Sequence, residues 1–196
     1  MKRQLKKSLL TAVLAPAILT LASANALAAP RYQERNPFLP DSVFMQAGQA
    51  EKGTHAYTVG AAWNWNWSRQ FRFGVVTGYT EAAVGRWHTD DAVPGGERWF
   101  TQVGVTPVLR LFPPSVSNRW FAEIGVGANY IAPMWHAEGK QFSTEFNFGD
   151  HLAFGRILGD RRQGSVALRI QHFSNGGIDE PNPGLNFAQL RYSYQF

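Results

Sequence analysis

Large apolar side chains alternate with small or polar ones over long stretches of the chain. In the stretch after His55 the apolar set lies at odd positions and comprises Tyr57, Val59, Ala61, Trp63, Trp65 and Trp67. The even positions between them hold Thr, Gly, Ala and Asn. Successive side chains of a β-strand point to opposite faces, so this period of two predicts strands with one apolar and one small or polar face.

The same alternation recurs along the chain and predicts eight strands. We expect them over 43–50, 54–67, 70–87, 98–112, 119–132, 142–158, 164–174 and 186–196. In the third strand Tyr79 belongs to the aromatic phase and Gly78 to the small one. Pro107 removes a backbone donor inside the fourth strand. The sixth strand changes phase near Gly149 and Asp150, and the Asp150-His151 pair is expected at an interface or in a loop.

Strand length, connections and the C-terminus together indicate a membrane barrel. Several strands reach the roughly 9–11 residues that cross a bilayer at a tilt. The connections at 66–70, 113–118 and 159–164 are short, and those at 88–97, 132–141 and 175–185 are longer. Short periplasmic turns and longer external loops are typical of outer-membrane barrels, and the chain ends in an alternating apolar stripe with Phe196 last. The sequence therefore predicts an all-β fold, an eight-stranded antiparallel transmembrane β-barrel of the outer-membrane type.

A soluble eight-stranded barrel of the lipocalin type also alternates, but it places large apolar residues inside. Here the small and polar phase suits a narrow interior, and the aromatic phase suits lipid. We expect lumen arginines to pair with lumen glutamates. The arginines are Arg72, Arg110, Arg169 and Arg191, and the glutamates are Glu81, Glu123 or Glu145.

The N-terminal stretch has the organisation of a secretory signal peptide. Basic residues lie within 2–7, an apolar run extends from Leu9 to about Ala22, and Ala26-Leu27-Ala28 suits cleavage. A run that contains Pro16 is short for a retained membrane anchor. We expect residues 1–28 to be removed and 29–196 to form a single barrel domain. The remainder has 15 basic and 14 acidic side chains and no Cys, which argues against nucleic-acid binding and excludes disulfides and thiolate metal sites.

The seventh strand carries the best candidate for chemistry. Leu168 and Ile170 share one phase with His172 and Ser174, and Arg169 lies in the other. If Arg169 faces the lumen, His172 and Ser174 face lipid near the external end of the strand. A His within reach of a Ser hydroxyl is the requirement for an activated nucleophile. The alternative is a pair of interfacial polar residues that contact lipid headgroups.

The loop after this strand continues the motif. The chain reads His172-Phe173-Ser174-Asn175-Gly176-Gly177 and then Pro181-Asn182-Pro183-Gly184. This segment resembles the His-x-Ser-Asn…Asn-x-Gly segment of the lipid A 3-O-deacylase (PagL) family, and weaker similarity extends through 62–67, 122–127 and 146–148. The resemblance implies an eight-stranded outer-membrane barrel. It also implies that a Ser, with His as base, attacks the ester carbonyl of the acyl chain at the 3-position of lipid A.

Position by position, the resemblance makes Ser174 the nucleophile and His172 the base. The family's acidic residue falls at Asn186, where this chain departs from the pattern. An Asn can accept the Nδ1 proton through its side-chain carbonyl and fix the tautomer, but it supplies no negative charge. Asp179 or Glu180 could take that place through folding of the loop.

Donors for the oxyanion are expected in the same loop. The resemblance favours Asn182 and Gly177, and Asn175 and the backbone N–H groups around Gly176 are further candidates. The same residues are also ordinary turn formers, and both roles can hold together.

On this interpretation the chain is an outer-membrane esterase that removes the ester-linked 3-hydroxyacyl chain from lipid A of lipopolysaccharide. The alternative is a non-enzymatic barrel of the small OmpA or OmpX type with a structural or adhesion role. We expect no cofactor, since Ser–His ester hydrolysis needs only water. We also expect no metal and no nucleic-acid partner. The sequence leaves open whether two copies of the barrel associate as a homodimer.

Overall fold

The computed structural model describes residues 36–114 and 119–196. The expected signal peptide over 1–28 lies outside these residues. The strands are β1 Ser42–Ala50, β2 Thr54–Phe71, β3 Gly74–Thr89, β4 Trp99–Phe112, β5 Trp120–Ala132, β6 His136–Ala137, β7 Lys140–Gln141, β8 Phe146–Leu158, β9 Gly164–Ser174 and β10 Leu185–Gln195. Within the described ranges no helix is long and apolar enough to cross a membrane, a finding that concerns helices alone.

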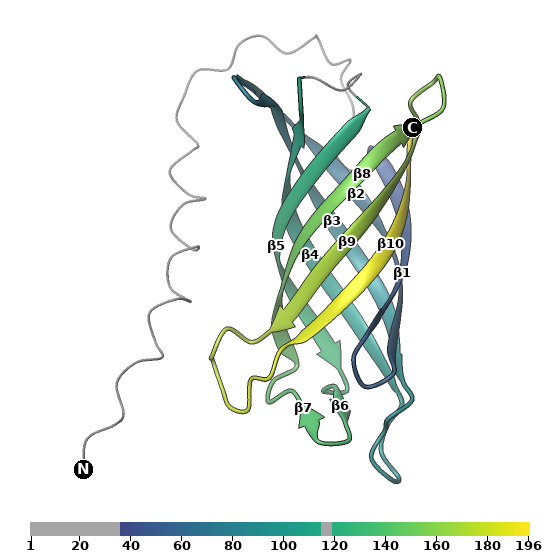
Figure 1. The fold of residues 1–196 in the computed structure, drawn as a ribbon, viewed down its shortest axis with the longest axis vertical. Coiled ribbons are helices and arrows are strands. Elements are labelled where there is room, and N and C mark those ends of the chain that lie inside the picture. The colour runs from purple at the N-terminus through teal and green to yellow at the C-terminus, as the bar shows by residue number, and fades with distance from the viewer. Residues whose placement is uncertain (1–35, 115–118) are drawn as a thin grey trace, which may run out of the picture.

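The predicted eight-stranded antiparallel barrel is confirmed. Its strands follow the closed order β1-β10-β9-β8-β5-β4-β3-β2, with β6 and β7 as a separate two-stranded sheet. The loops after β3, β5 and β9 lie at one end of the barrel, and the C-terminus lies at the other (Figure 1). We call the end with these longer loops the external end. Pro107 does not interrupt β4, because it is paired with Thr80 and exposed on the outer surface.

The turn between β2 and β3 lies later than predicted. β2 continues to Phe71 and β3 begins at Gly74, so the turn expected at 66–70 is wrong. The pairing of the two strands changes register between Asn64 and Ser68, and this irregularity accommodates the additional residues. Gly74 has a φ of 141°, a value that favours glycine at the start of the new strand.

The third strand also turns the opposite faces to those predicted. Tyr79 is 3% exposed and donates a hydrogen bond to Glu123 Oε1 inside the barrel, at 2.8 Å. Gly78 belongs to the outer face, where the Trp65 ring lies over it, so that a Cβ at Gly78 would come within 2.1 Å of that ring. The prediction was wrong because the Trp65 ring of β2 fills the outer space above Gly78, so that the small residue faces outward and Tyr79 faces the lumen.

β8 alternates regularly, and the expected change of phase is wrong. Asn147 and His151 are buried, whereas Asp150 and Leu152 are exposed. His151 therefore points into the lumen, at 3% exposure, instead of lying at an interface or in a loop. Asp150 lies on the outer surface.

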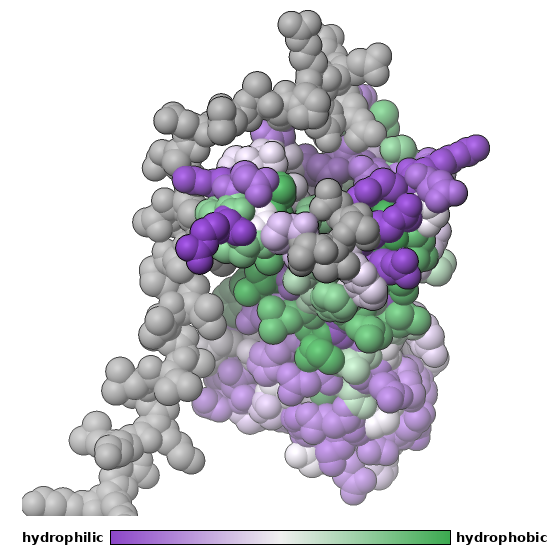
Figure 2. All heavy atoms as spheres, turned by 45° about the horizontal axis from the view of Figure 1, so that its top comes forward, coloured by the Kyte–Doolittle hydropathy of each residue, from purple (hydrophilic) through white to green (hydrophobic). Residues whose placement is uncertain are grey.

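The outer surface of the barrel is apolar at mid-height. Figure 2 shows hydrophobic residues gathered across the middle of the molecule, with hydrophilic residues toward both ends. The exposed apolar side chains include Val59, Val105, Leu152, Leu168, Ile170 and Leu190. An outward apolar band with a polar interior is the arrangement of a transmembrane barrel, and it excludes the lipocalin alternative.

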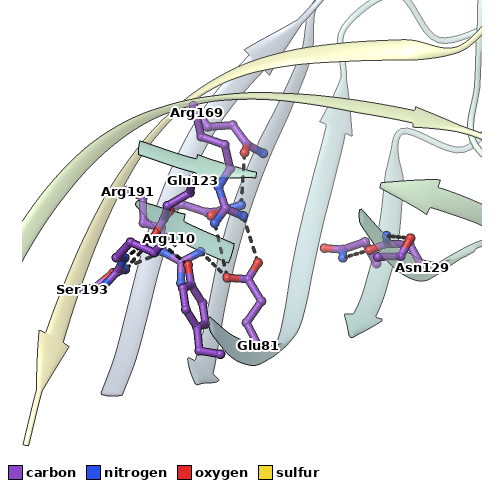
Figure 3. Close-up of polar contacts among 12 residues, drawn as sticks. Glu81, Arg110, Glu123, Asn129, Arg169, Arg191 and Ser193 are labelled. Carbon is purple, nitrogen blue, oxygen red and sulfur yellow. Dashed lines mark hydrogen bonds and ion pairs between the residues drawn. The ribbon is translucent and has the colours of Figure 1, made fainter. Parts of the chain in front are cut away.

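The lumen is filled by an ion-pair network (Figure 3). Glu81 accepts hydrogen bonds from Arg169 at 2.9 Å and from Arg191 at 2.6 Å, and Glu123 pairs with Arg110 at 2.6 Å. These predicted pairings are confirmed. Two other expectations are wrong: Arg72 is exposed in the β2–β3 turn, and Glu145 accepts a hydrogen bond from exposed Tyr130 instead of from a lumen arginine.

We expect Glu81→Gln to lower the free energy of unfolding by about 3–5 kcal/mol, because it leaves Arg169 and Arg191 buried without their carboxylate. Urea unfolding of the barrel in lipid vesicles measures the loss. Tyr79→Phe is the matched control, since it removes one hydrogen bond to Glu123 and should cost about 1 kcal/mol. Equal losses for the two variants would contradict the assigned role of Glu81.

An aromatic core closes the external end of the barrel. Trp87 packs against Phe173 and Phe187 with ring centroids 4.9 and 4.8 Å apart, and Trp135 of the β5–β8 connection packs against Phe142 at 5.1 Å. These five rings belong to one buried cluster. Phe173 and Phe187 point inward from β9 and β10. The cluster therefore fixes the backbone of both strands from the lumen side.

Candidate active site

His172 and Ser174 lie on the outer face of β9, as predicted. Arg169 on this strand is 1% exposed and faces the lumen, whereas Leu168 and Ile170 are 68% and 58% exposed. His172 and Ser174 continue the phase of Leu168 and Ile170 and are both partly exposed at the external end of the strand. The pair therefore faces the surrounding membrane at its outer edge.

The imidazole of His172 is held by two neighbours. Its Nδ1 lies 2.8 Å from Asn186 Oδ1, and the two residues are paired directly across β9 and β10. With Asn186 Oδ1 as acceptor, the ring proton lies on Nδ1 and Nε2 carries the free lone pair. Gly184 packs against the ring so closely that a Cβ there would lie 2.5 Å from His172 Cε1. Both contacts fix the orientation that a general base requires.

Ser174 lies two residues beyond His172 on the same face and is the last residue of β9. Side chains at this spacing are about 7 Å apart at their bases. No hydrogen bond joins Ser174 to His172 among the described residues, so contact between Oγ and Nε2 requires rotation of the side chains. Distances of this kind commonly shorten when substrate binds.

Asn175 organises the loop between β9 and β10. It is 1% exposed, and its Nδ2 donates to the Asp179 carbonyl at 2.7 Å and to Ser143 Oγ at 2.9 Å. Its Oδ1 accepts the Gly177 N–H at 2.8 Å. The side-chain groups of Asn175 and the N–H of Gly177 are thus engaged within the loop.

Asn182 is positioned differently from these two. Its Oδ1 accepts the Asn175 N–H at 3.1 Å, which directs its amide nitrogen away from that contact. The Asn182 Nδ2 forms no hydrogen bond to any of the described residues. Of the three candidate oxyanion residues, Asn182 has a side-chain donor available for a ligand.

The carboxylates of Asp179 and Glu180 bind the loop backbone. Asp179 Oδ1 accepts the N–H of Glu180 at 2.8 Å, and Glu180 Oε2 accepts the N–H of Asn182 at 3.0 Å. The structure therefore brings Asn186, and neither of these acids, to His172 Nδ1.

Asp150 is a neighbour of His172 that the sequence interpretation missed. It lies on the outer face of β8 and is paired directly with His172 across β8 and β9. The regular alternation from Phe146 to Phe154 indicates the outer face of Asp150, in phase with Phe148 and Leu152, but its closeness to His172 follows only from the pairing of β8 with β9.

Comparison with known proteins identifies one family. A family profile described as "Lipid A 3-O-deacylase (PagL)" matches residues 53–195. The chain is 36% identical over 132 residues to the lipid A deacylase PagL of Bordetella bronchiseptica, a match that covers 66% of this chain and 70% of that protein. It is 27% identical over 137 residues to the lipid A deacylase PagL of Pseudomonas aeruginosa, covering 69% of this chain and 75% of that protein.

A solved structure agrees in fold. The crystal structure of the outer membrane enzyme PagL matches with a TM-score of 0.66 and 23% identity, and the match covers 79% of this chain and 99% of that chain. The profile match begins before β2 and ends in β10, and so includes His172, Ser174 and Asn186. By these matches, which confirm the resemblance seen in the sequence, the chain belongs to the lipid A 3-O-deacylase (PagL) family.

Proposed function

We propose that this chain hydrolyses the ester of the 3-hydroxyacyl chain at the 3-position of lipid A, with Ser174 as nucleophile and His172 as general base. The observation that carries the proposal is the lipid-facing position of both residues at the external end of β9. A His and a hydroxyl on this face are costly without a partner or a purpose. Membership of the family supports the same activity.

The reaction begins with proton transfer from Ser174 Oγ to His172 Nε2. The Oγ then attacks the ester carbonyl, and a tetrahedral intermediate with a negatively charged oxygen forms. The imidazolium returns its proton to the departing sugar oxygen. Water, deprotonated by the same imidazole, hydrolyses the acyl-enzyme, so that a free 3-hydroxy fatty acid and regenerated Ser174 are the products.

Two neutral amides assist these steps. Asn186 keeps the proton of His172 on Nδ1 through the 2.8 Å hydrogen bond, which leaves Nε2 able to accept the serine proton. Asn182 is the donor we assign to the oxyanion, because its Nδ2 has no other partner among the described residues. Asn175 and Gly177 support this donor indirectly by fixing the loop.

The substrate enters laterally from the membrane. The buried aromatic cluster closes the external end of the lumen, and the ion pairs of Glu81 and Glu123 fill its middle. An acyl chain that lies along the outer face of β9 meets Leu168 and Ile170 below the reacting groups. The apolar outer surface therefore serves as the binding surface for the acyl chain.

Mass spectrometry of lipid A tests the proposal. The protein is expressed in Gram-negative host cells whose lipid A carries a 3-linked hydroxyacyl chain. The mass of their lipid A should then fall by the mass of that one chain. The same fatty acid should be released when purified protein in detergent is mixed with lipopolysaccharide. An unchanged acyl pattern in cells that contain folded barrel in the outer membrane would refute the activity.

We expect Gly184→Ala to lower kcat roughly tenfold or more, because the new Cβ would displace the His172 ring from its position against Asn186. Gly159→Ala is the matched control. Gly184 and Gly159 have φ values of 65° and 69°, but a Cβ at Gly159 meets nothing within 4 Å. Release of fatty acid by the two purified variants separates displacement of the ring from backbone strain, and equal rates would contradict the role of Gly184.

A further inference from the structure

Asp150 flanks His172 on the side opposite to Asn186. β9 lies between β8 and β10, and His172 is paired with Asp150 on one side and with Asn186 on the other. Side chains at directly paired positions have Cβ atoms about 4.5–5.5 Å apart. The imidazole therefore lies between a carboxylate and a neutral amide on the outer surface of the barrel.

The surroundings of Asp150 are otherwise apolar. Leu152, two residues along β8, is 63% exposed, and Val126, its partner on β5, is 39% exposed. Phe148 lies on the other side along the same strand face. A carboxylate at a membrane-facing position is costly and usually has a functional partner. In the described part of the chain Asp150 forms no ion pair with Lys or Arg, and the titratable side chain paired with it across β8 and β9 is that of His172.

The acid of a Ser–His–acid triad does two things: it holds the imidazole in one tautomer, and its charge stabilises the imidazolium. In this chain Asn186 can do only the first, through its hydrogen bond to Nδ1. Asp150 forms no hydrogen bond to the ring among the described residues, but it carries the charge that Asn186 lacks. The two residues lie on different strands and approach His172 from different sides.

We propose that Asp150 is a positioning residue that supplies the negative charge for the His172 imidazolium, while Asn186 orients the ring. This inference rests on the proposed function. When the Ser174 proton passes to Nε2, the ring gains one positive charge, and the Asp150 carboxylate stabilises that state. The proton then leaves with the sugar oxygen, and the ring is neutral again.

A double-mutant cycle in the full-length barrel tests the inference. Asp150→Asn removes the charge without a change of shape, and we expect kcat to fall about tenfold while KM stays unchanged. Asn186→Asp returns a carboxylate to the other side of the ring. In the Asp150→Asn background it should restore most of the lost kcat, whereas in the wild-type background its effect should be smaller.

Asp160→Asn is the matched control, since Asp160 is fully exposed in the turn after β8 and pairs with Arg119 at 3.8 Å. It alters net charge equally and should leave kcat unchanged. Two results would overturn the role of Asp150 and leave the proposed function standing. In the first, the wild type is active and Asp150→Asn has the same kcat. In the second, Asp150→Asn lowers kcat but Asn186→Asp does not restore it. Folded wild-type barrel that releases no fatty acid would overturn this role and the proposed function together.

Discussion

Ser174→Ala is expected to abolish release of the 3-hydroxy fatty acid, with a fall in kcat of roughly 10⁴-fold or more. Alanine removes the oxygen that forms the acyl-enzyme in the proposed reaction, and water at the same place lacks the fixed geometry of Oγ. The barrel itself should be unaffected, because the Ser174 side chain is partly exposed at the end of β9 and forms no hydrogen bond to the described residues, whereas the backbone pairing of Ser174 with Phe148 is kept in the variant. Lipid A mass spectra and the rate of fatty acid release in detergent measure the loss.

Ser165→Ala provides the control for this variant, since Ser165 lies near the opposite end of the same strand. Its rate should equal that of the wild type. A fluorophosphonate probe gives a second readout: it should label the wild type and Ser165→Ala, and should fail to label Ser174→Ala. Retained hydrolysis by Ser174→Ala would show that another group attacks the ester.

The second large effect is expected for His172→Gln, which should lower kcat by roughly 10⁴-fold. Glutamine has a similar size and can keep a hydrogen bond with Asn186, but it cannot accept the Ser174 proton. His55→Gln is the control, because His55 is also a partly exposed histidine at the external end beside an acidic residue. Its Nε2 lies 3.6 Å from Asp90 Oδ2. Its activity should not change.

Combining the two replacements distinguishes a shared function from separate ones. Groups that act together in one proton transfer have strongly non-additive effects. The variant with Ser174→Ala and His172→Gln should therefore be about as slow as either single variant. A double variant slower by the product of both factors would mean that His172 does not act through Ser174.

The outward position of His172 and Ser174 could be predicted because the same strand contains Arg169, a residue that marks which face points into the lumen. A buried arginine at 169 assigns the odd phase to the lumen, and a period of two then assigns 172 and 174 to the membrane. The link to Asn186 followed from the family resemblance. The 2.8 Å contact to Nδ1 required the register of β9 with β10.

Register also explains what the sequence did not reveal. The side of Tyr79 depends on the change of pairing between Asn64 and Ser68, and on the Trp65 ring above Gly78. Asp150 was overlooked for the same reason, since its closeness to His172 is set by pairing between strands and not by spacing along the chain. Which glutamate each lumen arginine binds is likewise a property of the closed barrel.

The residues assigned to the reaction come from three adjacent strands and the loop between the last two. Asp150, His172, Ser174, Asn182 and Asn186 all belong to the final third of the chain, on β8, β9 and β10 or between β9 and β10. β1 to β4 contribute closure, lumen charges and aromatic packing. A chimera that keeps this C-terminal segment and takes its first four strands from another eight-stranded barrel, with matching lumen charges, is therefore expected to carry the proposed activity onto a new scaffold.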